Sequence, residues 1–192
     1  MTADREICIY VFKQDEKSRD KRSDERICRC AKLFLCREAD KSGGSLPSLS
    51  VIRREGEKPR FLADIRLHFS VSHSGGFWVC AVSRQEVGID LEKKKNDYNR
   101  GIAKRYFHAS EHKYLEDNGF DNFFLIWTAK ESYVKFIGCG IGGGFSDFSV
   151  VKDGCIDCRV NGAELRFLPF DPQYSLCVCA KSLGEVFVIR KD

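Results

Sequence analysis

Acidic and basic side chains recur at short, regular spacings in two stretches of the chain. The segment VGIDLE places Asp90 and Glu92 two residues apart. The segment WTAKESYVK places Glu131 four residues before Lys135. Three carboxylates brought together would offer the oxygen ligands that Mg²⁺ prefers, and a nearby lysine would supply positive charge for a phosphate. The residue types therefore indicate metal-assisted phosphoryl chemistry.

Each pattern also has an ordinary structural interpretation. An acid pair on a strand is typical of the water-facing side of an antiparallel sheet. An exposed Glu–Lys pair at i,i+4 contributes only about 0.3–0.5 kcal/mol to helix stability. Neither pattern is specific alone, so the functional interpretation depends on their being brought to one place.

The strand around the acid pair predicts how it is oriented. Side chains alternate along a strand, so Val87, Ile89 and Leu91 face a core while Asp90 and Glu92 project from the other side, with Cα atoms roughly 7 Å apart. On that same side the glycine at position 88 leaves room, which we interpret as space for a closely approaching ligand.

The segment 123–138, FFLIWTAKESYVKFIG, predicts a helix that is apolar on nearly every side and therefore mostly buried. Its one polar stripe runs through Thr128, Glu131 and Lys135. Because a buried helix must turn such a stripe toward a polar site or water, we expect it to face the acid pair.

A further polar cluster lies in SVSHSGG, where Ser72 and His73 precede two glycines. The turn GEKPR places Lys58 upstream of it. These residues suit either a phosphate-binding contact or a solvent-exposed turn. They lack the glycine-flanked elbow of a hydrolase nucleophile.

The remaining chain predicts an α+β fold of strands, mostly in hairpins, with helices packed on them. Helices are expected over 16–37 and, as one element, over 102–117. FWVCAVS and YSLCVCA share a small, β-prone pattern, which suggests an ancient duplication. We therefore expect two halves, 1–95 and 96–192, that form one compact unit.

Composition narrows the class of protein. The 192 residues carry a net charge of +4, with 43% hydrophobic residues, which is typical of a globular chain. We expect no membrane segment and no signal peptide. The basic residues cluster, which favours an anionic ligand or an acidic partner over general nucleic-acid binding.

The ten cysteines do not predict a disulfide framework, because no export signal accompanies them; we expect a cytoplasmic location. Cys155 and Cys158 form a CxxC motif. Structural zinc would need two further ligands at matching spacing, so we favour a hairpin with incidental thiols.

In order, GEKPRF, FSVSHSGG, VGIDLE, IAKRYF and WTAKESYVK resemble motifs of the 4′-phosphopantetheinyl transferases of the type that activates surfactin synthetase. The resemblance runs from about Lys58 to Val151 and is weaker on either side. It implies a monomer with a pseudo-twofold fold of two subdomains, each of antiparallel strands packed with helices, and an active site in the cleft between them. Trp127 would pack at that seam and direct Glu131.

The resemblance implies transfer of 4′-phosphopantetheine from coenzyme A to a serine of an acyl or peptidyl carrier protein. Asp90, Glu92 and Glu131 would coordinate Mg²⁺. Glu131 would also act as general base, directly or through water. Lys135 would bind the pyrophosphate and stabilise the leaving 3′,5′-ADP, with Asp90 beside it in contact with coenzyme A.

The implied contacts to the 3′-phosphate and adjacent oxygens of coenzyme A come from His73, Ser72 and Lys58. One of three upstream arginines would join them: Arg22, Arg26 or Arg29. The basic stretch after the acid pair would bind the acidic helix of the carrier, with Tyr98 and Phe107 as apolar anchors. Its basic residues are Lys93, Lys94, Lys95, Arg100, Lys104 and Arg105.

Two other functions remain open at this point. A Mg²⁺-dependent nuclease could use the same acids and lysine for water attack on a phosphodiester. A non-catalytic binder of coenzyme A or of carrier proteins could retain the same residues. A transferase would modify a carrier serine, whereas neither the nuclease nor the non-catalytic binder would.

Overall fold

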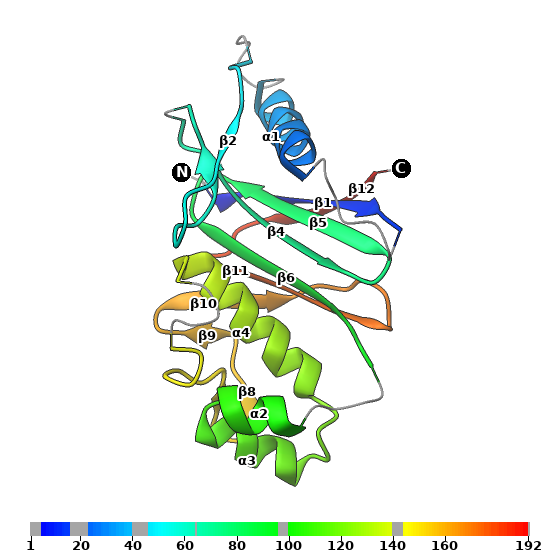
Figure 1. Cartoon of the computed structure of the whole chain (residues 1–192), viewed down its shortest axis with the longest axis vertical. Helices are drawn as coiled ribbons and strands as arrows, with labels where there is room; N and C mark the ends of the chain where they lie inside the picture. The colour runs from blue at the N-terminus through cyan, green and yellow to red at the C-terminus, as the bar shows by residue number, and fades with distance from the viewer. Residues whose placement is uncertain are drawn as a thin grey trace.

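The structure is a computed structural model that describes residues 5–15, 23–39, 46–63, 65–95, 100–139 and 144–191. It confirms an α+β fold, in which two four-stranded sheets carry helices on their faces (Figure 1). Two small two-stranded ribbons flank them. These are β2 (Val51–Ile52) with β3 (Arg60–Phe61), and β7 (Val151–Lys152) with β8 (Cys155–Ile156).

The first sheet has the strand order β12–β1–β5–β4. β1 pairs parallel with β12 and antiparallel with β5, and β5 pairs antiparallel with β4. Helix α1 (Ser23–Ala39) covers one face, where Ile27 and Phe34 are buried with Trp78. The strands are β12 (Val186–Lys191), β1 (Ile7–Lys13), β5 (Phe77–Ser83) and β4 (His68–Ser74).

The second sheet has the order β6–β11–β10–β9 and is antiparallel throughout. Helix α4 (Phe123–Ile137) crosses it, with α2 (Arg100–Tyr106) and α3 (Ala109–Asp117) farther out (Figure 1). The strands are β6 (Val87–Lys93), β11 (Tyr174–Ala180), β10 (Ala163–Phe167) and β9 (Arg159–Val160).

The predicted apolar face of β6 is confirmed, since Val87, Ile89 and Leu91 are fully buried in a core shared by the two sheets. The opposite face of β6 meets α4. A Cβ added to Gly88 would lie 1.9 Å from the Ser132 carbonyl oxygen and 2.5 Å from the Phe136 nitrogen. The prediction that Gly88 makes room for a ligand is therefore wrong: it admits the backbone of a helix.

The single helix expected over 102–117 is two helices, because a capping box interrupts it. His108 is the N-cap of α3, and its ring accepts a hydrogen bond from the Ser110 amide. The Glu111 carboxylate accepts one in return from the His108 amide at 2.9 Å. Both bonds satisfy amides that the first turn of a helix leaves unpaired.

Other expectations meet the structure in part. α1 begins at Ser23, and the earlier part of the helix expected over 16–37 lies outside the described residues. The boundary expected at 95/96 does not follow the sheets, because β6 pairs with β11 and β12 returns to pair with β1. Cys155 lies in β8 and Cys158 in the connection from β8 to β9, and both thiols are exposed. Within the described ranges, none of the helices is long and apolar enough to cross a membrane.

Candidate active site

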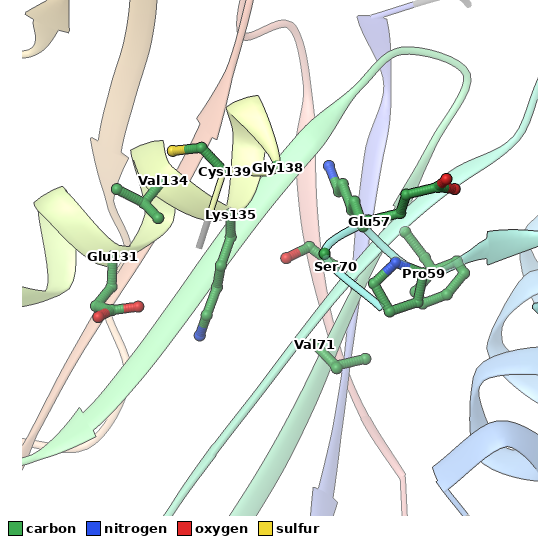
Figure 2. A pocket seen from close by; sticks show the side chains of 12 residues that line it. Glu57, Pro59, Ser70, Val71, Glu131, Val134, Lys135, Gly138 and Cys139 are labelled. Carbon is green, nitrogen blue, oxygen red and sulfur yellow. The ribbon is translucent and has the colours of Figure 1, made fainter. Parts of the chain in front are cut away.

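The two charged segments singled out in the sequence meet where α4 crosses β6. Lys135 Nζ donates a hydrogen bond to Asp90 Oδ1 at 2.6 Å. Asp90 is 2% exposed, whereas the Lys135 side chain keeps 29% of its surface exposed. Figure 2 shows Glu131 and Lys135 leaving α4 on the same side. The predicted polar stripe therefore faces the predicted acid pair.

The carboxylates of this cluster are crowded. Burial, followed by the charge of Asp90, raises the pKa of Glu131 to about 7. The same two causes raise the pKa of Glu92 above its ordinary value. The charge of Asp90 makes both glutamates harder to ionise, which is the electrostatic pattern that a bound cation relieves.

Unpaired oxygens mark the same place. In the described part of the chain, three buried side-chain oxygens have no hydrogen-bond partner: Asp90 Oδ2, Glu131 Oε1 and Ser175 Oγ. Ser175 lies directly opposite Glu92 in the β6–β11 pair, so the two side chains share a face. No three His, Cys, Asp or Glu side chains in the described ranges already converge as a finished metal site. Lys135 instead occupies the other oxygen of Asp90.

Ser72 belongs to this cluster. Its hydroxyl donates to Asp90 Oδ1 at 2.9 Å and accepts from the Leu91 amide at 3.2 Å. Lys135 Nζ also donates to it, at 3.2 Å. Ser72 is 7% exposed, so its immediate role here is to hold the acid and the lysine.

His73, the next residue of β4, points to the opposite face and is exposed. It lies opposite Trp78 in the β4–β5 pair, on the side that α1 covers. The Arg26 guanidinium lies 5.8 Å from the Trp78 ring centroid, and Arg29 lies 5.9 Å from the Phe12 ring. Two of the three candidate arginines therefore lie on the face that His73 shares. Arg22 lies outside the described residues.

Lys58 makes contacts that the sequence did not predict. Its Nζ donates to Glu86 Oε2 at 2.7 Å and to the Val87 carbonyl oxygen at 2.8 Å. Burial lowers the pKa of Lys58, and Glu86 partly offsets that effect. Lys58 thus anchors the β2–β3 turn against the start of β6.

A pocket of about 420 Å³ lies between the turn that carries Lys58, strand β4 and helix α4 (Figure 2). One wall comes from the turn that carries Lys58, a second from β4, and a third from α4 with Glu131 and Lys135. The pocket is lined by Gly56, Glu57, Lys58, Pro59, Phe69, Ser70, Val71, Glu131, Val134, Lys135, Gly138 and Cys139. Lys135 on its wall could contact a phosphate oxygen of a bound ligand.

Comparison with known proteins decides the family. A family model described as the 4′-phosphopantetheinyl transferase superfamily matches residues 86–186. That range covers more than half of the chain and includes Asp90, Glu92, Glu131 and Lys135. The chain belongs to the 4′-phosphopantetheinyl transferase superfamily.

Individual relatives confirm the resemblance to the surfactin-synthetase-activating type. A 4′-phosphopantetheinyl transferase of Bacillus subtilis is 37% identical over 137 residues, which cover 66% of this chain and 61% of the relative. The transferase gsp of Aneurinibacillus migulanus is 36% identical over 101 residues, 50% of this chain and 42% of the relative. The transferase Sfp of Bacillus subtilis strain 168 is 35% identical over 123 residues, which cover 59% of this chain and 54% of the relative. The chain thus spans about half the length of the relatives it matches.

Trp127 packs in an aromatic cluster, and the role in directing Glu131 that the sequence analysis gives it stays a prediction. Its ring lies against Phe107, Phe123 and Phe145, at centroid distances of 5.4–6.2 Å. Trp127 acts to lower the pKa of Glu92, against the larger effects of burial and of Asp90, which raise it.

A buried ion pair beside the site was missed from the sequence. Lys130 and Glu111 are both fully buried, with Lys130 Nζ 2.8 Å from Glu111 Oε2. Lys130 also donates to the Phe148 carbonyl oxygen and lies 3.9 Å from the Phe148 ring centroid. A lysine on the apolar face of the predicted helix, next to Glu131, was the signal available in the sequence.

The basic stretch after β6 keeps exposed charge but loses one predicted anchor. Phe107 is only 5% exposed and stacks on Phe123, so the prediction that it contacts a partner is wrong. Lys104 and Arg105 are exposed on α2, and Lys94 donates to the Pro172 carbonyl oxygen. The other predicted anchor, Tyr98, lies outside the described residues.

Proposed function

We propose that this protein transfers the 4′-phosphopantetheine group of coenzyme A to a serine of an apo acyl or peptidyl carrier protein, in a Mg²⁺-dependent reaction that releases 3′,5′-ADP. The names of its relatives support the reaction class. The observation that carries the proposal is the contact of Lys135 with Asp90 beside the unpaired oxygens of Asp90 and Glu131.

The donor set fits a hard divalent cation. Asp90, Glu92 and Glu131 would hold Mg²⁺, because unpaired buried carboxylate oxygens and raised carboxyl pKa values both call for a positive charge among them. When bound, the ion would offset the charge of the coenzyme A pyrophosphate. Lys135 would then exchange Asp90 for a phosphate oxygen.

In the transfer, the carrier serine oxygen forms a bond to the phosphorus that bears the pantetheine arm. The bond from this phosphorus to the oxygen of 3′,5′-ADP breaks, and the serine proton passes to Glu131. Lys135 stabilises the charge that develops on the departing phosphate. Burial of Glu131 and Asp90 keeps water from competing with the serine.

The 3′-phosphate of coenzyme A is assigned to His73 together with Arg26 and Arg29, which share one face of the first sheet. We keep the expected contacts of Ser72 and Lys58 with coenzyme A, although both side chains already have partners within the protein. Lys58 must exchange Glu86 for a ligand oxygen, and Ser72 must share its hydroxyl with Asp90.

The strand orders support two related halves. The same order of antiparallel pairings occurs twice, in β1–β5–β4 with α1 and in β6–β11–β10 with α4. The internal repeat of the sequence lies in β5 and β11. We assign residues 1–95 and 96–192 to the two halves. β6 lies in the first range but pairs with the second sheet, and β12 lies in the second range but pairs with the first. The pocket between β4 and α4 is the corresponding cleft.

The carrier is assigned to the exposed basic side chains of α2, Lys104 and Arg105. We assign the protein to the cytoplasm as a monomer. Sedimentation velocity at working concentration tests the monomer, since a dimer would sediment as a species of twice the mass.

Intact-mass analysis of an apo carrier, coenzyme A, Mg²⁺ and this protein tests the reaction. The carrier should gain one phosphopantetheine, and EDTA should prevent the gain. A carrier with its acceptor serine replaced by alanine is the control and should gain nothing. Absence of any gain over several acyl and peptidyl carriers would contradict the proposal.

A further inference from the structure

The two sheets meet at β4 and β6 through side chains and not through a backbone ladder. Three serines of β4, at every second residue, accept hydrogen bonds from backbone amides of β6. The pairs are Ser70 with Ile89 (3.1 Å), Ser72 with Leu91 (3.2 Å) and Ser74 with Lys93 (2.9 Å). We call these three residues the serine ladder.

The serine ladder fixes the register of the two strands. Each pair is separated by 19 residues, so β4 and β6 run in the same direction and stay in step over all three contacts. Since an amide of β6 that lacked its acceptor would be buried unpaired, a shift of register would cost one hydrogen bond per serine.

Two members of the ladder use their remaining proton on an acid of the candidate site. Ser72 donates to Asp90 Oδ1 at 2.9 Å, and Ser74 donates to Glu92 Oε2 at 3.0 Å. The residue at the equivalent position for Ser70 is Gly88, which has no side chain to accept a hydrogen bond. At two of the three positions, the same hydroxyl therefore fixes the register of β6 and the direction of a carboxylate on it.

We propose that Ser74 is a positioning residue that orients Glu92 for the metal. Glu92 is held by the Ser74 hydroxyl, which donates to its Oε2 at 3.0 Å. One oxygen, Oε2, is thereby fixed toward β4, which limits the directions that the other oxygen can take. Groups that hold a ligand in this way change metal affinity by roughly 10–100-fold when removed.

The proposal depends on the proposed function at one point, the assignment of Glu92 as a metal ligand. Ser70 gives a matched comparison, because Ser70→Ala removes a β6 amide acceptor without removing a carboxylate contact. Ser74→Ala removes both. The two variants therefore separate loss of strand register from loss of orientation at Glu92.

Binding of Mn²⁺ alone, measured by electron paramagnetic resonance of the free ion, tests the inference without turnover. Ser74→Ala should raise the Mn²⁺ Kd about tenfold. Ser70→Ala should change that Kd less than about twofold, and Ser74→Thr should bind like the wild type. Ser74→Cys keeps the size of the side chain with a weaker donor, and it provides the same comparison if the alanine variant does not fold.

Two results would overturn the role of Ser74: a wild-type Kd in Ser74→Ala, or an equal rise in Ser70→Ala. Asp90→Asn distinguishes this failure from failure of the metal site. Loss of Mn²⁺ binding in Asp90→Asn with normal binding in Ser74→Ala would remove only the serine assignment. Unchanged binding in Asp90→Asn would contradict the metal site itself.

Discussion

Lys135 Nζ lies 2.6 Å from Asp90 Oδ1 and joins helix α4 to strand β6. The contact neutralises one carboxylate of a crowded group while the ammonium remains partly exposed on the wall of the pocket. A lysine in this position can exchange a carboxylate for a phosphate oxygen over a short movement. In the proposed transfer, its charge would then lie where the leaving group develops.

Replacement of Lys135 by alanine should affect the chemical step more than binding. We expect the single-turnover rate to fall roughly 100-fold, because the lost charge acts chiefly on the developing phosphate. The Kd of coenzyme A, measured by calorimetry, should rise less than about fivefold, since other groups also hold the phosphates. A rise in Kd that accounts for the whole loss of kcat/KM would assign Lys135 to ground-state binding.

Replacement of His73 by alanine should discriminate between two donors. The KM of coenzyme A should rise about tenfold, the size of one lost charge-assisted hydrogen bond. The KM of dephospho-coenzyme A should change less than about twofold, because it lacks the 3′-phosphate. His112→Ala, on α3, is the control. An equal change for both donors would remove His73 from the 3′-phosphate.

Lys130→Met should destabilise the fold, because it leaves Glu111 buried without its cation. We expect the free energy of unfolding in urea to fall by about 3–5 kcal/mol. Lys113→Met is the matched control, since the Lys113–Asp117 pair is exposed and should contribute less than about 1 kcal/mol. Similar small losses in both variants would mean that Glu111 is protonated or otherwise accommodated.

Glu86 should make stability depend on pH. The hydrogen bond with His68 lowers the pKa of Glu86 most, and the contact with Lys58 lowers it further, so that it falls from 4.5 to about 2. The resulting stability is present above pH 4.5 and is lost as the pH falls toward 2, because protonation breaks both contacts. Glu86 is half exposed, so solvent limits the effect to about 1 kcal/mol. In urea unfolding from pH 5 to pH 2.5, the advantage of the wild type over Glu86→Gln should shrink; a constant difference would contradict this.

The elements with a strong local period could be predicted from the sequence. Alternation along β6 separated Ile89 from Asp90, and the apolar helix placed Glu131 and Lys135 on its one polar stripe. The same alternation, applied to β4, would have separated Ser72 from His73, which the resemblance had grouped around one phosphate. The alternation of side chains along β4 therefore predicts that Ser72 and His73 face opposite sides, which the family motif does not indicate.

Long-range contacts could not be predicted in this way. Nothing local to Lys58 indicates that Glu86 accepts from it, and nothing local to Lys130 names Glu111 as its partner. The break between α2 and α3 did have a local signal, because Glu111 follows His108 at capping-box spacing. Gly88 was correctly singled out for close approach, but only the packing of α4 shows what approaches.

The central claim is that Asp90 on β6 and Glu131 on α4 act together in the transfer, and single-turnover formation of holo carrier tests it most directly. Asp90→Asn and Glu131→Gln should each slow the reaction at saturating Mg²⁺ by about 100-fold or more. Both variants should remain folded. Glu131→Gln should keep the wild-type melting temperature or exceed it, because it neutralises a buried acid with an unpaired oxygen. Asp90→Asn should melt somewhat lower, because it gives up the ion pair with Lys135. Rates within about threefold of the wild type in either folded variant would contradict the account.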